Sequence, residues 1–184
     1  MKLKNSKQNN DKSPAPAPVK TRPGPGAAMS RAPAFDYRIQ SILVPIDFSE
    51  ASKTALKYSL TLAQKFGAKL TLLYVVARVS IPDFAYSPLM MENEKVIEAG
   101  YAELKKLSAE EKIDPRFLET TLVRNGVAYR EITEAAKSLK ADLIVISTHG
   151  NTGLKHLMLG STAERVVRYA GCPVLVVRQA ENGS

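Results

Sequence analysis

Short apolar runs alternate with amphipathic stretches along the chain from residue 39 onward. Five runs have the length and composition of β-strands: 41–47 (SILVPID), 69–76 (KLTLLYVV), 117–123 (FLETTLV), 142–146 (DLIVI) and 173–177 (PVLVV). The first is a β-branched apolar run ended by Pro45 and Asp47, which predicts a strand buried on both faces. The third alternates with polar residues and is therefore a weaker prediction.

Apolar residues at helical spacing separate these runs. Ser49 can cap a first helix, whose apolar positions continue to Phe66 and which Gly67 ends. Three more helices are expected: about 90–111, around 132–139, and from Ser161 onward. Strands and helices that alternate at this spacing indicate right-handed crossovers and an open parallel sheet with helices on both faces. The fold class is therefore α/β.

Residues 1–38 have a different composition. They hold eight Lys and Arg against two Asp and Glu, and six of the eleven prolines. A segment with so little to bury cannot offset the entropy of ordering itself, so a disordered basic tail with polyproline-like stretches is expected. Two roles stay open. One is a solvated extension without a partner, for which a translation start at Met29 is a further explanation, and the other is an arm that binds polyanions or a membrane surface.

The formal net charge of +8 comes mainly from this tail. Residues 39–184 hold 18 Lys and Arg against 16 Asp and Glu, so nucleic-acid binding is not expected of the domain that they form. The single Cys172 excludes an intramolecular disulfide and favours a reducing, cytoplasmic location; we expect a packed residue rather than a nucleophile. No apolar run reaches the roughly 20 residues of a membrane helix, and no apolar segment of a secretory signal follows the basic start.

The residues of chemical interest lie at two strand ends and at one helix start. Pro45, Ile46 and Asp47 close the first strand, and a loop of small residues, 147–153 (STHGNTG), follows the fourth. Ligands of open α/β sheets bind beyond the carboxyl ends of the strands, where the strand order reverses. The helix that opens at 160–162 (Gly-Ser-Thr) offers backbone N–H groups and a positive dipole end to a phosphate.

Ser161 has a structural interpretation as well. With Glu164 it fits a capping box, in which the hydroxyl and the carboxylate each accept a hydrogen bond from a backbone donor at the helix start. Helix capping and phosphate binding both explain this spacing.

The fourth strand is followed by Ser147-Thr148-His149-Gly150, nine further residues, and then Gly160-Ser161. This arrangement resembles the pattern G-x2-G-x9-G-[ST] of the universal stress protein family, in its nucleotide-binding branch. Further segments fall in the family's order: ILVPIDFSE, LLYVV, DLIVISTHG, LMLGSTAERVV and CPVLVVR. The resemblance covers essentially residues 39–184.

The resemblance implies an open five-stranded parallel sheet of order 3-2-1-4-5, of the adenine nucleotide alpha hydrolase type. It implies homodimers that pair through the last strand, Val174 to Val177, and ATP or AMP in a crevice between the tips of strands one and four. Asp47 would accept hydrogen bonds from the nucleoside, and Val75 would meet the adenine through its backbone. A Mg or Mn ion would be held mainly by the phosphates and by water. The nucleotide-binding residues that it implies are Pro45, Ile46, Asp47, Val75, Ile146, Ser147, Thr148, His149, Gly150, Gly160, Ser161 and Thr162.

One position departs from the family pattern, because Ser147 stands where the pattern has its first glycine. If that position needs a left-handed backbone or a close backbone approach, serine costs about 1 kcal/mol or more and weakens binding. If it needs only a small side chain, serine adds a hydroxyl donor. We expect the second, since every other element of the pattern is retained.

Three functions are compatible with this sequence. A nucleotide-binding regulatory or stress-response protein without efficient catalysis is preferred, because the chain lacks a P-loop motif, a catalytic base, a lysine clamp and an arginine finger. A slow ATPase or phosphotransferase is the second. The third is a dimerisation scaffold whose nucleotide site is vestigial, for which Ser147 is the reason.

Overall fold

The structure is a computed structural model that describes residues 37–77, 86–148 and 159–178, with backbone only for 86–93. The predicted basic tail lies almost entirely outside the described residues. The same holds for His149 and Gly150 of the predicted site.

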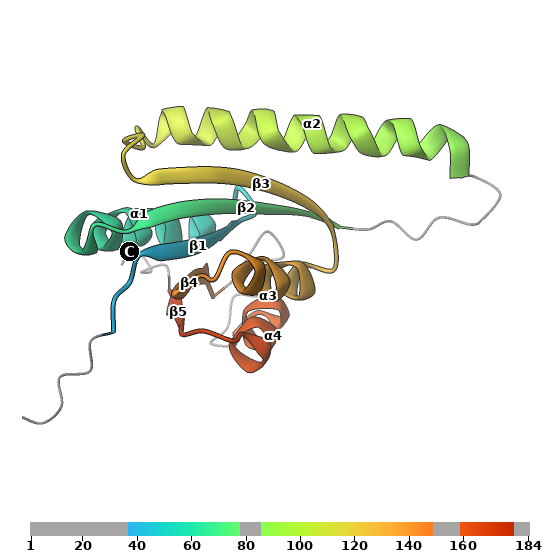
Figure 1. Cartoon of the computed structure of the whole chain (residues 1–184). Coiled ribbons are helices and arrows are strands. Elements are labelled where there is room, and N and C mark those ends of the chain that lie inside the picture. The colour runs from blue at the N-terminus through green and yellow to red at the C-terminus, as the bar shows by residue number, and fades with distance from the viewer. Residues whose placement is uncertain (1–36, 78–85, 149–158, 179–184) are drawn as a thin grey trace, which may run out of the picture. The chain divides into compact units, whose positions relative to one another are not determined.

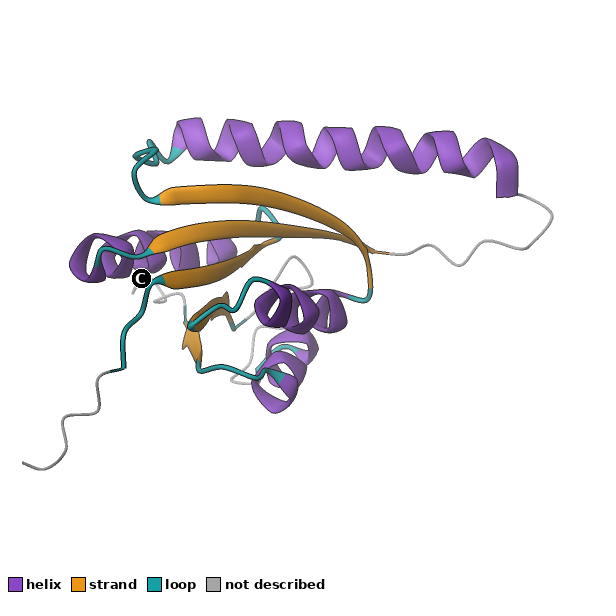
Figure 2. Ribbon diagram, in the orientation of Figure 1, coloured by secondary structure: helices purple, strands orange, loops and turns teal. Residues whose placement is uncertain are grey.

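Five parallel strands form one sheet in the order β3-β2-β1-β4-β5. The strands are β1 (Ser41–Ile46), β2 (Lys69–Ala77), β3 (Leu118–Gly126), β4 (Leu143–Ser147) and β5 (Val174–Val177). The helices between them are α1 (Glu50–Phe66), α2 (Tyr86–Glu110), α3 (Ala128–Ser138) and α4 (Ser161–Tyr169). Figures 1 and 2 show the strands as one twisted layer with the helices packed beside it. The predicted α/β class, the parallel sheet and its strand order are confirmed.

The two faces of the sheet carry separate cores, because successive residues of a strand point to opposite sides. In β1, Ile42 and Val44 face α1 and α2, whereas Leu43 faces α3 and α4. All three side chains are fully buried. This explains why the strand sequences are apolar without alternation, as a sheet covered on both faces requires.

The first helix begins and ends as the sequence predicts. The Ser49 hydroxyl accepts a hydrogen bond from the Ser52 N–H at 3.1 Å. Gly67 ends the helix with a left-handed backbone, φ 68°. Two other boundaries differ from the prediction. Helix α2 begins at Tyr86 rather than near residue 90, and β3 continues to Gly126 rather than ending at 123.

The longer β3 has a physical reason. It is an edge strand with β2 as its neighbour, and its last residues, Arg124, Asn125 and Gly126, still pair with Val75, Val76 and Ala77 of β2. Polar residues are tolerated along such an edge, so the sequence gives no contrast between the end of the strand and a loop. Within the part of the chain that the structure describes, no helix has the length and apolar character needed to cross a membrane.

Candidate functional site

The sheet opens between β1 and β4 at their carboxyl ends. β1 pairs with β2 over its whole length, up to Ile46 opposite Tyr74, but pairs with β4 only at Ile42 and Leu43. The N–H and C=O groups of Ser41 both point toward β4, where they bond with Asp142. Backbone groups alternate in direction along a strand, so position 45 also faces β4.

Proline at position 45 has no N–H to donate, which ends the ladder on the β4 side and leaves the ladder to β2 intact. The strand order also reverses at β1, since β2 lies on one side of it and β4 on the other. Pro45 therefore lies at the switch point of the sheet, where α/β sheets bind ligands and where the family resemblance implies a crevice between β1 and β4.

The start of α4 is tied to the tip of β4. The Gly160 N–H donates to the Thr148 carbonyl at 2.8 Å, and the Thr148 N–H donates to the Val177 carbonyl of β5 at 3.0 Å. These bonds bring together two parts of the glycine pattern that are twelve positions apart in the sequence. The helix start thus lies at the same edge of the sheet as the crevice.

The capping-box prediction for this helix is wrong. The N-cap residue is Gly160, Ser161 is the first helical residue, and no side chain of the described residues caps the helix start. The Glu164 carboxylate accepts from Arg168 at 2.9 Å, one turn along the same helix, and not from the helix start. Ser161 is exposed. Side-chain capping therefore does not explain the Ser161 hydroxyl or the N–H groups in the first turn of α4.

On the other side of the crevice, β1 is followed by a tight turn that holds Asp47. Its carboxylate atom Oδ1 accepts hydrogen bonds from the Ser49 N–H at 3.1 Å and from the Ser49 hydroxyl at 2.6 Å. The Asp47 N–H donates to the Ser52 hydroxyl at 3.4 Å. Phe48, between them, has a left-handed backbone with φ 64°. The half-buried carboxylate is fixed by α1, next to the place where β1 and β4 part.

The structure answers one question about Ser147, which is whether its position has a left-handed backbone. It is buried in β4, opposite Val177, and it does not belong to the described non-glycine residues with positive φ. A left-handed backbone is therefore not required there, and serine carries no such conformational cost. Strand alternation places its side chain on the α1 face with Val145, rather than beside Ile146 on the opposite face.

Comparison with known proteins agrees with this fold. A family model described as the universal stress protein family matches residues 38–178. The chain belongs to the universal stress protein family. Universal stress protein MJ0531 of Methanocaldococcus jannaschii is 40% identical over 148 residues, which cover 76% of this chain and 82% of that protein.

Two solved structures extend the comparison. Universal stress protein UspA from Lactobacillus plantarum has a TM-score of 0.65 and 30% identity, and the match covers 77% of this chain and 99% of that chain. A universal stress protein in complex with cAMP has a TM-score of 0.55 and 23% identity, covering 76% of this chain and 97% of that chain. At this lower identity the likeness shows the fold alone.

In this universal stress protein the remaining predicted residues lie at the same edge of the sheet. Val75 lies in β2 and is half-buried on the α3 and α4 face. Ile146 is buried in β4 on that same face, and Thr162 lies in the first turn of α4. The predicted residues that the structure describes thus lie toward the carboxyl ends of β1, β2 and β4 and at the start of α4, with Ile46 on the α1 face and Val75 and Ile146 on the opposite face.

Two residues near this edge escaped the sequence analysis. Phe48 was missed because a left-handed backbone is signalled by Gly or Asn and not by Phe. Arg124 lies opposite Val75 on β3, and its guanidinium pairs with Glu131 of α3 at 3.7 Å. Its position at a strand end is the only signal that the sequence offered.

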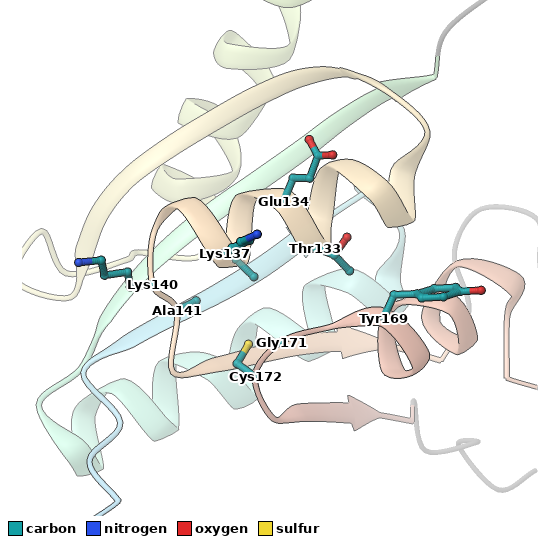
Figure 3. A pocket seen from close by; sticks show the side chains of 9 residues that line it. Thr133, Glu134, Lys137, Lys140, Ala141, Tyr169, Gly171 and Cys172 are labelled. Atoms are coloured by element: carbon teal, nitrogen blue, oxygen red, sulfur yellow. The ribbon is translucent and has the colours of Figure 1, made fainter.

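A hollow of about 570 Å³ lies at the opposite edge of the sheet, where β4 and β5 begin. Figure 3 shows the Lys140 amine and the Tyr169 hydroxyl pointing away from Cys172. Burial, and then the charge of Asp142, raise the pKa of the Cys172 thiol. The thiol is therefore protonated near neutral pH, which supports the packed role expected for it. The residues that line the hollow are Thr133, Glu134, Ala136, Lys137, Lys140, Ala141, Tyr169, Gly171 and Cys172.

Proposed function

We propose that this universal stress protein binds an adenine nucleotide, ATP or AMP, in the crevice between β1 and β4. The observation that carries the proposal is the hydrogen bond from the Gly160 N–H to the Thr148 carbonyl. It holds an uncapped helix start beside the tip of β4, where the positive end of the helix dipole suits a phosphate.

Each side of the crevice has a distinct task in this proposal. Asp47, fixed by Ser49, accepts hydrogen bonds from the nucleoside, and the Val75 backbone contacts the adenine. The phosphates lie against the start of α4, at Gly160, Ser161 and Thr162. The set is completed at the two strand ends by Pro45, Ile46 and residues 146–150. Residues 149 and 150 lie outside the described part of the chain.

A divalent ion, Mg or Mn, fits these residues only as a companion of the phosphates. Within residues 37–77, 86–148 and 159–178, no three His, Cys, Asp or Glu side chains gather closely enough to hold a metal ion. The ion would neutralise phosphate charge when the nucleotide is bound, with the phosphates and water as its ligands. Asp47 remains a nucleoside ligand.

The cations of α4 favour binding over efficient catalysis. Arg165 lies over the Tyr129 ring, 5.2 Å from its centroid, and Arg168 pairs with Glu164. Phosphoryl transfer depends on cations aimed at the phosphates. We therefore propose a regulatory or stress-response role, with residues 39–184 as the functional domain and 1–38 as a basic tail.

A homodimer that pairs through β5 is part of the proposal. Among the described strands β5 has one neighbour, β4, so its other edge offers backbone groups for pairing. Leu175, in the middle of this short strand, is 38% exposed. An exposed apolar residue on an open strand edge is typical of a surface that pairs with another strand.

The nucleotide proposal is tested on purified full-length protein. Heat extraction followed by mass spectrometry identifies a bound nucleotide, and calorimetry with ATP and Mg measures its affinity. We expect ATP or AMP to be released or bound, with loss of at least tenfold in affinity for Asp47→Ala and Ser161→Ala. Ser108→Ala, on α2, is the control.

Two results would contradict this proposal in different ways. A protein that is empty and ignores added ATP and AMP would favour the scaffold with a vestigial site. Hydrolysis of ATP faster than about 1 per second, abolished by Asp47→Ala, would show an enzyme instead.

A further inference from the structure

Three of the described non-glycine residues have a left-handed backbone: Phe48 (φ 64°), Lys112 (φ 50°) and Lys140 (φ 52°). Lys112 and Lys140 each lie two residues after the last residue of a helix, α2 and α3 respectively. The chain closes each helix there with hydrogen bonds from Ile113 to Ser108 and from Ala141 to Ala136. Left-handed residues are common at such helix ends. Phe48 lies instead between a strand and a helix start, where no such closure accounts for it.

The Phe48 side chain has a defined partner. Its ring lies 4.8 Å from the Tyr74 ring, centroid to centroid, at an interplanar angle of 60°. Tyr74 is itself held in β2, opposite Ile46, and lies against Gly100 of α2. A ring pair with this spacing and tilt is attractive. The contact offsets the unfavourable left-handed backbone of a residue with a Cβ atom.

The backbone of Phe48 determines what its two neighbours can reach. The Asp47 carboxylate accepts from the N–H and the hydroxyl of Ser49, two residues on, so the chain must turn back at position 48. The Ser49 hydroxyl in turn accepts from the Ser52 N–H of α1. A chain of contacts thus runs from the Phe48 ring, through the left-handed turn and the Asp47 carboxylate, to the N-cap of α1.

We propose that Phe48 is a positioning residue for the nucleoside end of the crevice: its ring, held on Tyr74, keeps the 47–49 turn in the form that fixes the Asp47 carboxylate. This inference rests on the proposed nucleotide binding. The role assigned to Phe48 is indirect. It acts through Asp47, so its effect is the same for adenosine as for ATP.

Three variants separate the effect of losing the Phe48 ring from the effect of a left-handed backbone at position 48. Phe48→Ala loses the ring and keeps the cost of a left-handed Cβ residue, so we expect adenosine and ATP affinity to fall about fivefold to tenfold. Phe48→Gly also loses the ring but adopts the turn without that cost. Its affinity should stay within about twofold of the wild type, although both variants lose thermal stability. Phe48→Tyr keeps the ring and should bind like the wild type.

A double-mutant cycle tests whether Phe48 acts through the carboxylate. In protein that carries Asp47→Ala, adding Phe48→Ala should cost no further affinity. A purely structural role predicts the same fold loss in both backgrounds. That outcome, or equal affinities for Phe48→Ala and Phe48→Gly, would overturn the inference.

A second measurement needs no nucleotide. The Ser49 amide is protected by the Asp47 carboxylate, so Phe48→Ala should raise its hydrogen-exchange rate by at least tenfold, with Phe48→Tyr unchanged. The Ala55 amide, within α1, is the control. Unchanged exchange in Phe48→Ala, or an unprotected Ser49 amide in the wild type, would refute the positioning role. Absence of nucleotide binding by the wild type would instead refute the proposed function.

Discussion

At Gly100, α2 packs closely against the sheet, so adding one methyl group there tests the packing between α2 and the sheet. A Cβ built at Gly100 would lie 3.0 Å from Tyr74 Cδ1 and 3.0 Å from Val123 Cγ1. Ordinary carbon contacts lie at about 3.5–4.0 Å, so each neighbour must move by several tenths of an ångström. Tyr74 is held by the Phe48 ring, and Val123 is β-branched and stiff at χ1.

The magnitude for Gly100→Ala follows from two opposing effects. Alanine in a helix interior is favoured over glycine by about 1 kcal/mol. Overpacking a site whose neighbours cannot move costs about 1–3 kcal/mol. The difference between these two effects is a fall of about 0–2 kcal/mol in the free energy of unfolding, so packing should cancel or outweigh helix propensity.

Urea denaturation followed by circular dichroism measures this change. Ala102→Gly, at an exposed position two residues along α2, supplies the propensity contribution within the same helix. Gly171→Ala is the second control, because no atom lies within 4 Å of its added Cβ and its φ is not left-handed. If Gly100→Ala is more stable than the wild type by the amount that Ala102→Gly loses, the argument for a closely packed α2 is refuted.

Three further predictions follow from the described contacts. Asp142→Ala removes the carboxylate that accepts from the N–H groups of residues 40 and 41. The free energy of unfolding, measured by urea titration, should fall by about 1–3 kcal/mol, and Asp142→Asn should recover part of the loss. If β5 pairs in a dimer, Leu175→Glu should give a monomeric mass by light scattering. Val127→Glu, at another exposed apolar position, should leave the mass unchanged. A monomeric wild type at micromolar concentration would contradict the dimer. The raised pKa of Cys172 means that the folded state holds its proton longer than the unfolded state. Its contribution to stability is therefore intact below the ordinary thiol pKa, about 8.5, and declines as pH rises above it, a decline that Cys172→Ala should remove.

Local patterns in this chain predicted the elements well, because the sheet is covered on both faces. Ser49 and Gly67 mark the ends of α1 by chemistry that acts within a few residues. The strand order could not be reached in that way. Alternating strands and helices give a parallel sheet, but several orders satisfy it, and 3-2-1-4-5 came from the resemblance to a family.

The capping-box prediction failed because longer-range bonds prevailed over local ones. Ser161 and Glu164 have the required spacing, but Gly160, whose N–H donates to the Thr148 carbonyl, is the N-cap residue and Ser161 is already helical. Glu164 then pairs with Arg168 four residues on, which is a favourable spacing on a helix surface. The spacing of residues within one helix contains no information about the contact between Gly160 and the end of β4.

The site at the end of β1 combines two residues that oppose regular structure. Pro45 ends the ladder to β4, and Phe48 adopts a left-handed backbone in the turn where Ser49 holds the Asp47 carboxylate. Pro45 costs a hydrogen bond of the ladder, and Phe48 carries the conformational cost of a left-handed backbone. Both are offset by contacts on the far side from the crevice: the ladder from β1 to β2, and the Phe48 ring on Tyr74. The β2 strand thus supports the end of β1 from the side away from β4. If the proposed nucleotide site is correct, substitutions at Tyr74 should affect nucleotide binding although the residue faces α2.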